Sequence, residues 1–595
     1  MSRLSIASVV FVFIALGVAA SPASAQPLYE TRAVWLATIL GDGNWPVNGQ
    51  SPAEQQTALE ALIERAAQVG INTLYFQVIA RGDALYPSTR LPWTPLPLGA
   101  GRDPGYDPLQ VAIDAAHRAG MELHAWINVF RVGDSTTRTA FAGVQNPMHV
   151  VYAQPGWVQQ VGSELWLDPS VAEARAWMLG NVMELVEGYD LDAVHFDFAR
   201  YPQGGLPDDA SNFQFDPRGF ADIDDWRRNN VTLFVESAFE AVSAAKPWVK
   251  LGAAPLGNYQ PADAWPGLWA YFDVYQESRL WAERGWMDYL APQIYFSTGT
   301  APDAGQTTPT PDFTVLVDEW VRESGGRPII AGMAPYKAAE GRFPASDLVT
   351  QIVNTRAYDG AGHAAFRYDH LMQYESLYRE QYPKPALPAR SAHRFEAAAP
   401  STPQGFRIVS IQNGAANLAW NPSDGAAADP LRAYALFRRI GAPPDPTAGR
   451  DLLAVVDRDV TTFTDVVPSD NEVYYQIAAT SRLGMVSMPS QAVSTSMPTA
   501  VETANEGPRW ALIESIYPNP SRQTAEVRYA VGSVGRVNVA VVDLLGRVRY
   551  RYSDAAHQAG SHQLTLDTSR YAPGVYFFVL EAGDRSVTRA FAVVR

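Results

Sequence analysis

From Thr31 to Leu371, short hydrophobic runs alternate with longer stretches in which hydrophobic positions recur every three or four residues. The short runs have the length of β-strands, and the longer stretches have the period of amphipathic helices. Strands that alternate with helices in this way are typical of parallel α/β folds. Eight strands are predicted here, over residues 32–39, 72–79, 122–129, 193–198, 250–255, 289–296, 328–333 and 364–368.

Two of the helical stretches have clear ends. Residues 52–69 are followed by Gly70 and residues 109–119 by Gly120, and glycine is preferred where a helix ends. Eight strands with intervening helices predict an α/β fold of the TIM type, a (β/α)₈ barrel. A doubly wound open sheet is the alternative, but no glycine-rich phosphate loop follows the first strand.

Helical periodicity disappears after a Pro- and Ala-rich stretch at residues 386–403, which we interpret as a linker that follows a barrel domain of residues 26–385. Residues 404–497 carry short strands, predicted over 406–411, 416–420, 433–438 and 473–479. An early Trp420 and a late Tyr474–Tyr475 pair are typical of the core of a fibronectin type III-like β-sandwich.

A second linker is predicted at residues 498–510, and it leads to a last β-rich segment, residues 511–595. The alternating pattern of this segment predicts a small β-sandwich.

The first 25 residues have the features of an export signal. Arg3 precedes an apolar run over residues 6–20, and Ala23-Ser24-Ala25 matches a signal-peptidase site. No later run reaches the roughly 18–20 apolar residues that a membrane span requires. We therefore expect a mature chain that begins near Gln26 and passes through the periplasm.

Charge and cysteine content exclude several classes of function. The net charge is −16, which disfavours nucleic acid and anionic membranes as partners because both require basic surfaces. The chain has no cysteine, so disulfides, thiol catalysis and Cys-ligated metals are excluded. Its 16 Trp and 27 Tyr are compatible with the stacking of sugars, although large hydrophobic cores use the same residues.

In a barrel of this type, the ligand site lies at the C-terminal ends of the strands. Strand alternation places Trp126 and Asn128 on one inward face, and His195 and Asp197 on another. Polar groups at inward positions are costly to bury unless they bind something, so their coincidence predicts a functional rim. The candidate substrate-binding residues are Gln77, Arg81, Tyr86, His124, Trp126, Asn128, His195, Arg200, Tyr201, Gln293 and Tyr295.

Asp197 is the first candidate for catalysis because it ends the fourth strand. Arg200 follows three residues later, and a neighbouring guanidinium is expected to lower the pKa of the Asp197 carboxyl, which suits a nucleophile or a base. Glycoside hydrolysis needs a second carboxyl with a raised pKa. Glu277, in an aromatic stretch that would raise its pKa by desolvation, is one candidate, and Asp83 and Asp288 are the alternatives.

Metal and cofactor chemistry find no support in the motifs. The nine histidines show no HExxH spacing, and neither a nucleophile elbow nor a phosphate loop is present. We expect no metal and no cofactor.

A series of motifs runs in order through the barrel region, between residues 30 and 380. The motifs are RAVWLAT at 32–38, WP at 45–46, YFQV at 75–78, RGDALY at 81–86, PW at 92–93, HAWIN at 124–128 with Arg131, LDP at 167–169, HFD at 195–197, RYP at 200–202, WRR at 226–228 and PQIY at 292–295. With these motifs, the region resembles the glycosyl-hydrolase-like family 10 domain of bacterial envelope and secreted proteins. This resemblance implies a TIM barrel and glycosidase activity. Because a relative acts on peptidoglycan strands stripped of their stem peptides, it also implies that polymer as a substrate.

The C-terminal segment resembles a type IX secretion sorting domain, on the motifs YPNP at 517–520, DLLGR at 543–547, LD at 566–567 and YAPGVY at 571–576. The resemblance implies the type IX machinery as a partner and a final location outside the cell or on the outer-membrane surface. A carbohydrate-binding β-sandwich is the alternative for this segment.

Three functions remain open at this point. The first is a glycoside hydrolase in which Asp197 acts with Glu277 or Asp83. The second is a barrel that binds polysaccharide at an aromatic rim without cutting it. The third is an architectural surface protein in which the first β-sandwich is a spacer.

Overall fold

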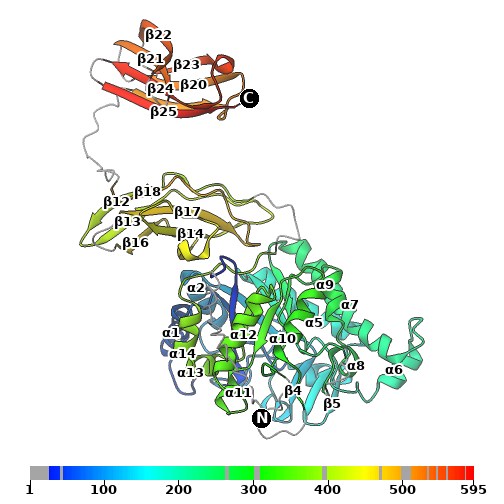
Figure 1. Cartoon of the computed structure of the whole chain (residues 1–595). Coiled ribbons are helices and arrows are strands. Elements are labelled where there is room, and N and C mark those ends of the chain that lie inside the picture. The colour runs from blue at the N-terminus through cyan, green and yellow to red at the C-terminus, as the bar shows by residue number, and fades with distance from the viewer. Residues whose placement is uncertain are drawn as a thin grey trace, which may run out of the picture. The chain divides into compact units, whose positions relative to one another are not determined.

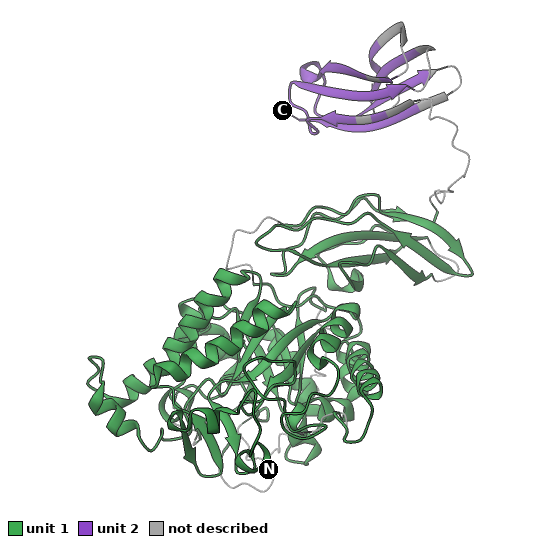
Figure 2. Cartoon of the chain, turned by 180° about the vertical axis from the view of Figure 1, so that it is seen from behind, with its two compact units in different colours: residues 1–500 green, residues 501–595 purple. Residues whose placement is uncertain are grey.

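The computed structural model describes residues 26–40, 45–260, 265, 267–299, 309–391, 399–467, 472–496, 511–531, 535–543, 547–557, 560–582 and 585–594. The predicted signal peptide (1–25) and the predicted second linker (498–510) lie outside these residues. The chain forms two compact units, residues 1–500 and 501–595 (Figure 2).

The first unit is built on a closed parallel sheet, which confirms the predicted TIM-type barrel (Figure 1). The strand order is β10-β11-β1-β2-β3-β7-β8-β9, and a bridge between Leu290 and Ile329 joins the two edges. Closure protects the two edge strands, β9 and β10, from pairing with another chain. The strands are β1 (Thr31–Leu36), β2 (Thr73–Ile79), β3 (Glu122–Asn128), β7 (Ala193–Asp197), β8 (Lys250–Ala253), β9 (Tyr289–Leu290), β10 (Ile330–Met333) and β11 (Gly362–Ala365).

Helices surround the sheet, and their ends follow the sequence signals. Helix α1 (Pro52–Val69) begins with a capping box between Ser51 and Glu54 and ends at Gly70, whose φ is 98°. The other main helices are α2 (Pro108–Arg118), α5 (Ala172–Gly188), α7 (Ile223–Ala245), α9 (Ser278–Glu283), α10 (Phe313–Arg322), α12 (Ser346–Ala357), α13 (Tyr368–Gln373) and α14 (Glu375–Gln381).

Shorter elements lie in the connections between strands and helices. The hairpin-like sheet β4-β6-β5 follows β3 and lies beside the C-terminal end of the barrel. These elements are η1 (Thr38–Leu40), β4 (Arg131–Asp134), α3 (Thr137–Ala140), α4 (Val150–Ala153), η3 (Pro155–Trp157), β5 (Val158–Val161), β6 (Glu164–Leu167), α6 (Asp209–Phe215), α8 (Ala270–Asp273) and α11 (Pro335–Ala339).

Strand alternation divides the buried side chains into two layers. The larger core lies between the sheet and the helices and includes Val194 and Phe196 of β7. A smaller cluster fills the barrel interior and includes Trp35, Tyr75 and Tyr289. His195 is inward and 0% exposed, as the two-residue period predicts.

Four hydrogen bonds run through the barrel interior in a single chain. The Trp35 indole N–H donates to His195 Nε2 at 3.1 Å, and His195 Nδ1 lies 2.9 Å from the Tyr289 hydroxyl. That hydroxyl lies 2.7 Å from His124 Nδ1, and His124 Nε2 lies 3.0 Å from a carboxylate oxygen of Glu122. We call these four bonds the barrel chain.

The barrel chain fixes the tautomer of both histidines. Because Trp35 can only donate, His195 accepts at Nε2 and carries its proton at Nδ1. The Tyr289 hydroxyl therefore donates to His124 Nδ1, and His124 donates from Nε2 to Glu122. Burial lowers the pKa of both histidines, so the two rings are neutral.

A β-sandwich follows the barrel, as predicted. One sheet holds β12 (Arg407–Gln412), β13 (Ala415–Ala419) and β16 (Thr462–Val466). The second sheet contains four strands, and the predicted core residue Trp420 packs on Tyr434 with ring centres 5.5 Å apart. The Tyr475 hydroxyl donates to the Asp465 carboxylate at 2.7 Å. The second sheet consists of β15 (Leu452–Asp457), β14 (Leu431–Ile440), β17 (Val473–Ser481) and β18 (Val493–Ser494), with η4 (Gly449–Asp451) before β15.

The sandwich is joined to the N-terminal end of the barrel by buried ion pairs. Arg482, 2% exposed, contacts Asp192 at 2.9 Å and Asp190 at 2.5 Å. Arg432 lies 3.4 Å from Asp192 and 3.8 Å from Glu122, the carboxylate that ends the barrel chain. The two modules therefore share one network of charges.

Part of the predicted first linker is packed structure. Leu387 is 4% exposed and exchanges backbone hydrogen bonds with Leu28 and Glu30, and Ser391 donates to the carbonyl of Leu483 at 3.0 Å. The first residues of the predicted linker therefore pair their backbone groups with both modules. Residues 392–398 lie outside the described part of the chain.

The second unit is a smaller β-sandwich with its own core, which confirms the last β-domain of the prediction. Val527, Phe578 and Phe591 are among its buried residues. Its sheets are β19-β20-β23 and β22-β21-β24-β25. The elements are β19 (Ala511–Tyr517), β20 (Thr524–Val531), β21 (Gly535–Asp543), β22 (Val548–His557), β23 (Gly560–Asp567), η5 (Thr568–Arg570), β24 (Gly574–Ala582) and β25 (Arg585–Val593).

Replacing Tyr289 by Phe should destabilise the barrel by at least about 2 kcal/mol, because His124 loses its donor and His195 its acceptor in a buried site. Urea unfolding measures the effect. Tyr378→Phe is the matched control, since Tyr378 is 1% exposed and its hydroxyl has no partner among the described residues. That variant should be as stable as the parent or more stable. Equal stability of all three proteins would contradict the role of the barrel chain.

Replacing Arg482 by Gln should cost about 3–5 kcal/mol, because it leaves the Asp192 carboxylate buried with too little compensating charge. Arg458→Gln is the control at the same junction. Arg458 pairs with Asp190 at 2.8 Å but is 35% exposed, so its loss should cost about 0–1 kcal/mol. Similar unfolding midpoints for the two variants would show that the junction does not depend on the buried pair.

Candidate active site

A cavity of about 250 Å³ lies at the C-terminal ends of the barrel strands. Five of its lining residues are aromatic, three are amides, and Asp197 is the carboxylate among the described lining residues. A wall of this composition suits sugars, since the aromatic rings can stack on the sugar and the amides can bond its hydroxyls. The lining residues are Trp35, Ala37, Ile39, Gln77, Trp126, Asn128, Arg131, Asp197, Phe198, Gln293, Tyr295 and Phe366.

Asp197 is held by the turn that ends strand β7. Phe198 has a φ of 49°, in the left-handed region that a bulky side chain rarely adopts. This turn directs the Phe198 N–H back to Asp197 Oδ1 at 2.7 Å, and Gln293 Nε2 donates to the same oxygen at 3.2 Å. Oδ1 accepts both hydrogen bonds, so Oδ2 is available for a proton and a ligand.

Arg200 acts on the pKa of the Asp197 carboxyl in the expected downward direction, but the expectation of a net lowered pKa was wrong. Burial is the largest influence and raises this pKa, because it penalises the charged form of a side chain that is 7% exposed. Arg200, the Phe198 N–H, Arg131 and Gln293 each oppose the shift without reversing it. The raised pKa shifts the balance of Asp197 toward the protonated form, which is the form that a general acid requires.

The aromatic wall is a set of rings in edge and stacked contact. Phe366 lies 5.6 Å from Tyr295, 6.0 Å from Trp35 and 6.5 Å from Trp126 between ring centres. Trp35 is also the first donor of the barrel chain, so the chain fixes the orientation of one cavity wall.

The amide side chains are positioned by neighbouring strands and loops. Asn128 donates to the carbonyl of Ala80 at 2.7 Å and accepts from the Trp126 indole at 3.2 Å. Gln293 also donates to the carbonyl of Ala254 at 3.1 Å. Since these bonds span adjacent strands, the polar groups are held in place before any ligand binds.

Six of the predicted site residues line this cavity. They come from four strand ends, as the alternation argument requires. These residues are Gln77, Trp126, Asn128, Asp197, Gln293 and Tyr295.

The other predicted substrate-binding residues lie outside the cavity lining. His124 and His195 belong to the barrel chain, beneath the cavity floor. Arg81 pairs with Asp134 at 3.3 Å, and the Tyr86 hydroxyl donates to Glu184 at 3.1 Å.

The two residues after the Asp197 turn also have structural partners. The Arg200 guanidinium lies 4.6 Å from the centre of the Phe198 ring. Tyr201 is 0% exposed, and its hydroxyl accepts from Asn230 at 2.8 Å.

The three candidates for a second carboxyl also lie outside the lining. Glu277 accepts from the Thr232 hydroxyl of α7 at 3.1 Å, and burial raises its pKa as expected. Asp83 is 1% exposed and accepts from the Arg81 N–H at 2.8 Å. Asp288 accepts from the Leu251 N–H at 2.7 Å. The structure brings none of these carboxylates to Asp197.

A model described as glycosyl hydrolase-like 10 matches residues 30–315, and a model described as secretion system C-terminal sorting domain matches residues 515–594. Glycosyl hydrolase YngK of Bacillus subtilis is 32% identical over 490 residues, which are 78% of this chain and 92% of YngK. The chain belongs to the glycosyl hydrolase-like 10 family. Both resemblances noted in the sequence are confirmed.

The chain is also similar to two other proteins of known sequence or structure. Glycosyl hydrolase DigH of Escherichia coli is 35% identical over 295 residues, which are 46% of this chain and 66% of DigH. The glycoside hydrolase domain of PgaB from Bordetella bronchiseptica is similar in structure, with a TM-score of 0.41 and 17% identity over 59% of this chain and 98% of that domain.

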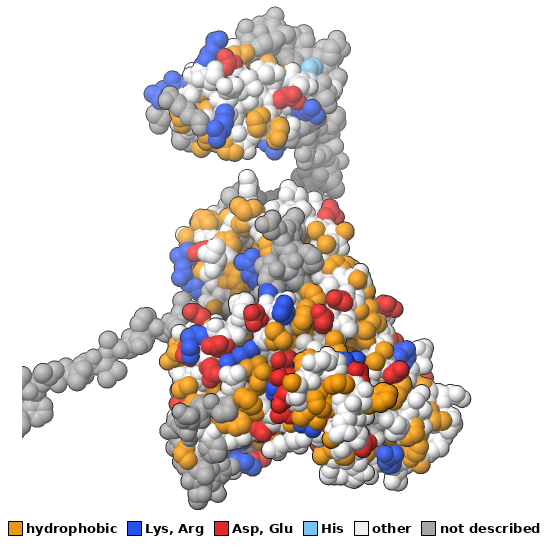
Figure 3. Space-filling view, turned by 90° about the vertical axis from the view of Figure 1, so that its right-hand side faces the viewer, with side chains coloured by type: hydrophobic (Ala, Val, Ile, Leu, Met, Phe, Trp, Pro, Cys, Tyr) orange, Lys and Arg blue, Asp and Glu red, His pale blue; other side chains and the backbone are white. Residues whose placement is uncertain are grey.

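The C-terminal sorting domain fits a secreted or cell-surface protein. Within the described residues, no helix has the length and hydropathy to cross a membrane. On the face drawn in Figure 3, basic side chains are interspersed with acidic and hydrophobic ones.

The sequence analysis missed several residues that line the cavity at the C-terminal ends of the strands. Trp35, Phe198 and Phe366 are hydrophobic, so they gave no indication of catalysis or polar binding. Arg131 lies in β4, outside the barrel sheet, so the inward and outward alternation of the barrel strands does not predict where its side chain points. Trp35 could have been found, because it shares the inward face of β1 with Ala33 and Ala37.

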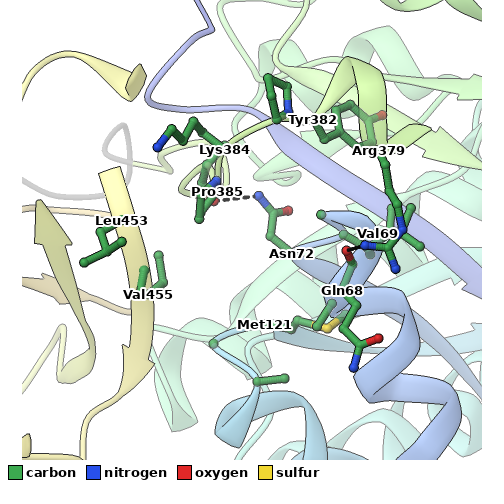
Figure 4. A pocket seen from close by; sticks show the side chains of 18 residues that line it. Gln68, Val69, Asn72, Met121, Arg379, Tyr382, Lys384, Pro385, Leu453 and Val455 are labelled. Atoms are coloured by element: carbon green, nitrogen blue, oxygen red, sulfur yellow. Dashed lines mark hydrogen bonds between the residues drawn. The ribbon is translucent and has the colours of Figure 1, made fainter. Parts of the chain in front are cut away.

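A second cavity, of about 460 Å³, lies at the other end of the barrel, against strand β15 of the sandwich (Figure 4). Two of its polar side chains already have partners: Asn72 donates to the carbonyl of Ala386 at 2.9 Å, and Arg379 to that of Gln68 at 2.7 Å. No carboxylate is among its described lining residues, so it offers no acid or base for hydrolysis.

Replacing Asp197 by Asn should change stability in a pH-dependent way. Because the pKa of Asp197 is raised on folding, the carboxyl stabilises the folded state below its ordinary pKa, and this contribution is lost as the pH rises through the raised pKa. The variant should therefore gain stability relative to the parent as the pH rises above about 4, the ordinary pKa of an Asp carboxyl. Urea unfolding across this range measures the difference, and a constant difference would contradict the raised pKa.

Proposed function

We propose that this chain is a glycoside hydrolase that cleaves O-glycosidic bonds in a polysaccharide, with Asp197 as the general acid. The observation that carries the proposal is a buried carboxyl with a raised pKa in an aromatic cavity at the C-terminal rim of a barrel. Membership of the glycosyl hydrolase-like 10 family supports the same reaction class.

The chemistry follows from the two oxygens of Asp197. Oδ1 accepts from Phe198 and Gln293, so the proton is held on Oδ2. Its transfer to the glycosidic oxygen lets the bond from that oxygen to the anomeric carbon break. Water then adds to the anomeric carbon, and the proton that it releases restores the acid. The products are two shorter chains, one of which has a new reducing end.

The attacking water also has to be activated, on the opposite face of the sugar. Asp83 and Glu277 remain the proposed partners for this step. Asp83 is favoured by its place in the loop after β2, on the same side of the barrel as the cavity, and its Oδ2 is buried without a partner among the described residues. Glu277 is less favoured because Thr232 of the helix layer already bonds it.

The substrate that we propose is peptidoglycan stripped of its stem peptides. A fully extended stem peptide is bulky, whereas the cavity of about 250 Å³ has the size for a bare sugar. The sorting domain would deliver the enzyme through the type IX machinery to the surface or the medium, after export by the predicted signal peptide.

A non-catalytic polysaccharide-binding protein is the second candidate. It is favoured by one observation, that Asp197 is the carboxylate among the described lining residues while five lining residues are aromatic. This candidate predicts saturable binding without the release of reducing ends.

Asp197→Asn should reduce the release of reducing ends from stripped peptidoglycan by about 10²–10⁴-fold, because amide cannot supply the proton. In the parent, kcat/KM should fall as the pH rises through the raised pKa of Asp197. Reducing-end assays and product masses provide the measurement.

Glu277→Gln and Asp83→Asn, tested in the same assay, identify the partner by which of them loses turnover. Full activity of Asp197→Asn would overturn the assignment of the acid. Binding of the polymer by the parent without any products would favour the second candidate.

A further inference from the structure

We propose that Arg131 determines specificity by binding a carboxylate carried by the sugar next to the cleaved bond, so that the substrate is an acidic glycan. This inference rests on the proposed hydrolase activity and names the substrate class of the same cavity.

Arg131 is the first residue of β4, directly after the loop that leaves β3, and its side chain lines the cavity. Glu164 of β6 contacts its Nε at 2.8 Å, and the guanidinium carbon lies 5.2 Å from the centre of the Phe198 ring. The side chain is 19% exposed. Its two terminal amino groups have no acceptor among the described residues, so they are available to a ligand.

A second arginine makes the wall electrostatically unbalanced. The Arg200 guanidinium lies 4.6 Å from the same Phe198 ring and 5.7 Å from the Trp166 ring. Burial is the largest influence on Arg200 and lowers its pKa, and the charge of Arg131 acts in the same direction. Two like charges are therefore held together at a partly buried site.

The imbalance is greatest in the form of the site that would be active. When Asp197 is protonated, Glu164 is the carboxylate left to face both Arg131 and Arg200. Partly buried positive charge that exceeds the negative charge around it is costly. A bound anion offsets that cost, and its own charge raises the pKa of Asp197 further, which keeps the acid protonated.

The geometry of the cation favours a carboxylate. A guanidinium presents parallel N–H groups that match the two oxygens of a carboxylate. In peptide-stripped peptidoglycan, the lactyl carboxylate of every second sugar is free, whereas a stem peptide converts it into a neutral amide. An arginine in the cavity thus provides a physical reason for preferring stripped strands over intact ones.

The test compares two forms of one polymer on the full chain. The first is peptide-stripped peptidoglycan, and the second is the same material with its lactyl carboxylates coupled to methylamine by carbodiimide. We expect the parent to prefer the free carboxylate by about 10- to 100-fold in kcat/KM, mainly through KM. Because the change is made in the substrate, this comparison does not depend on the folding of any variant.

Two variants then assign the preference to Arg131. Arg131→Gln should lose activity on the free carboxylate while its activity on the methylamide changes little, and Arg131→Lys should retain part of the preference. Arg279→Gln is the matched control, since Arg279 is 16% exposed, pairs with Glu319 at 2.6 Å and lies over an aromatic ring, but does not line the cavity. It should show the full preference of the parent.

The outcomes separate this inference from the proposed function. Equal cleavage of both polymers by the parent would overturn the role of Arg131 and leave the hydrolase intact. Cleavage of neither polymer would overturn the proposed function. In that case, the affinity of the chain for the two polymers decides the inference, because a carboxylate preference that Arg131→Gln abolishes would support it and equal affinity would overturn it.

Discussion

The structure depends on the requirement that polar groups in a closed barrel find partners without water. Five side chains meet it through four hydrogen bonds, which all run in one direction from the Trp35 indole to the Glu122 carboxylate. Each member can play only one role, because Trp35 has no acceptor and an ionised Glu122 has no donor. Hydrophobic side chains would fill the barrel interior more simply, but the barrel chain holds Trp35 in one orientation at the cavity wall.

The lower end of the barrel chain explains why barrel and sandwich form one unit. Glu122 is fully buried with Asp192 nearby, and Lys250 at 2.6 Å offsets only part of this negative charge. Arg432 and Arg482 of the sandwich lie close to this cluster. Against the effect of burial, Lys250 and His124 hold the pKa of Glu122 at about 2, and His117, Arg482 and Arg432 hold that of Asp192 well below its ordinary value. The sandwich is therefore part of the barrel's electrostatic balance, which does not favour its interpretation as a simple spacer.

The upper end shows burial and charge acting against one another. Arg200 and Arg131 favour the ionised form of Asp197, but desolvation outweighs them and raises its pKa. The same two cations remain as excess positive charge when Asp197 holds its proton. The property that makes the residue a suitable acid thus also makes the cavity attractive to an anionic sugar.

The sequence by itself determined the barrel, its eight strands and the inward faces of Gln77, Trp126, Asn128, Asp197, Gln293 and Tyr295, because hydrophobic period and strand alternation are local properties of the chain. Strand alternation shows which side chains point inward but not how deep they lie along the barrel. His124 and His195 were therefore predicted as site residues, although they lie beneath the cavity in the barrel chain. Only the tertiary structure decided the direction of the Asp197 pKa shift, since desolvation depends on residues distant in sequence while the proximity of Arg200 is visible at once. It likewise decided that Glu277 faces Thr232 and that Arg131 reaches the cavity, because the path of a loop between two strands is set by what it packs against.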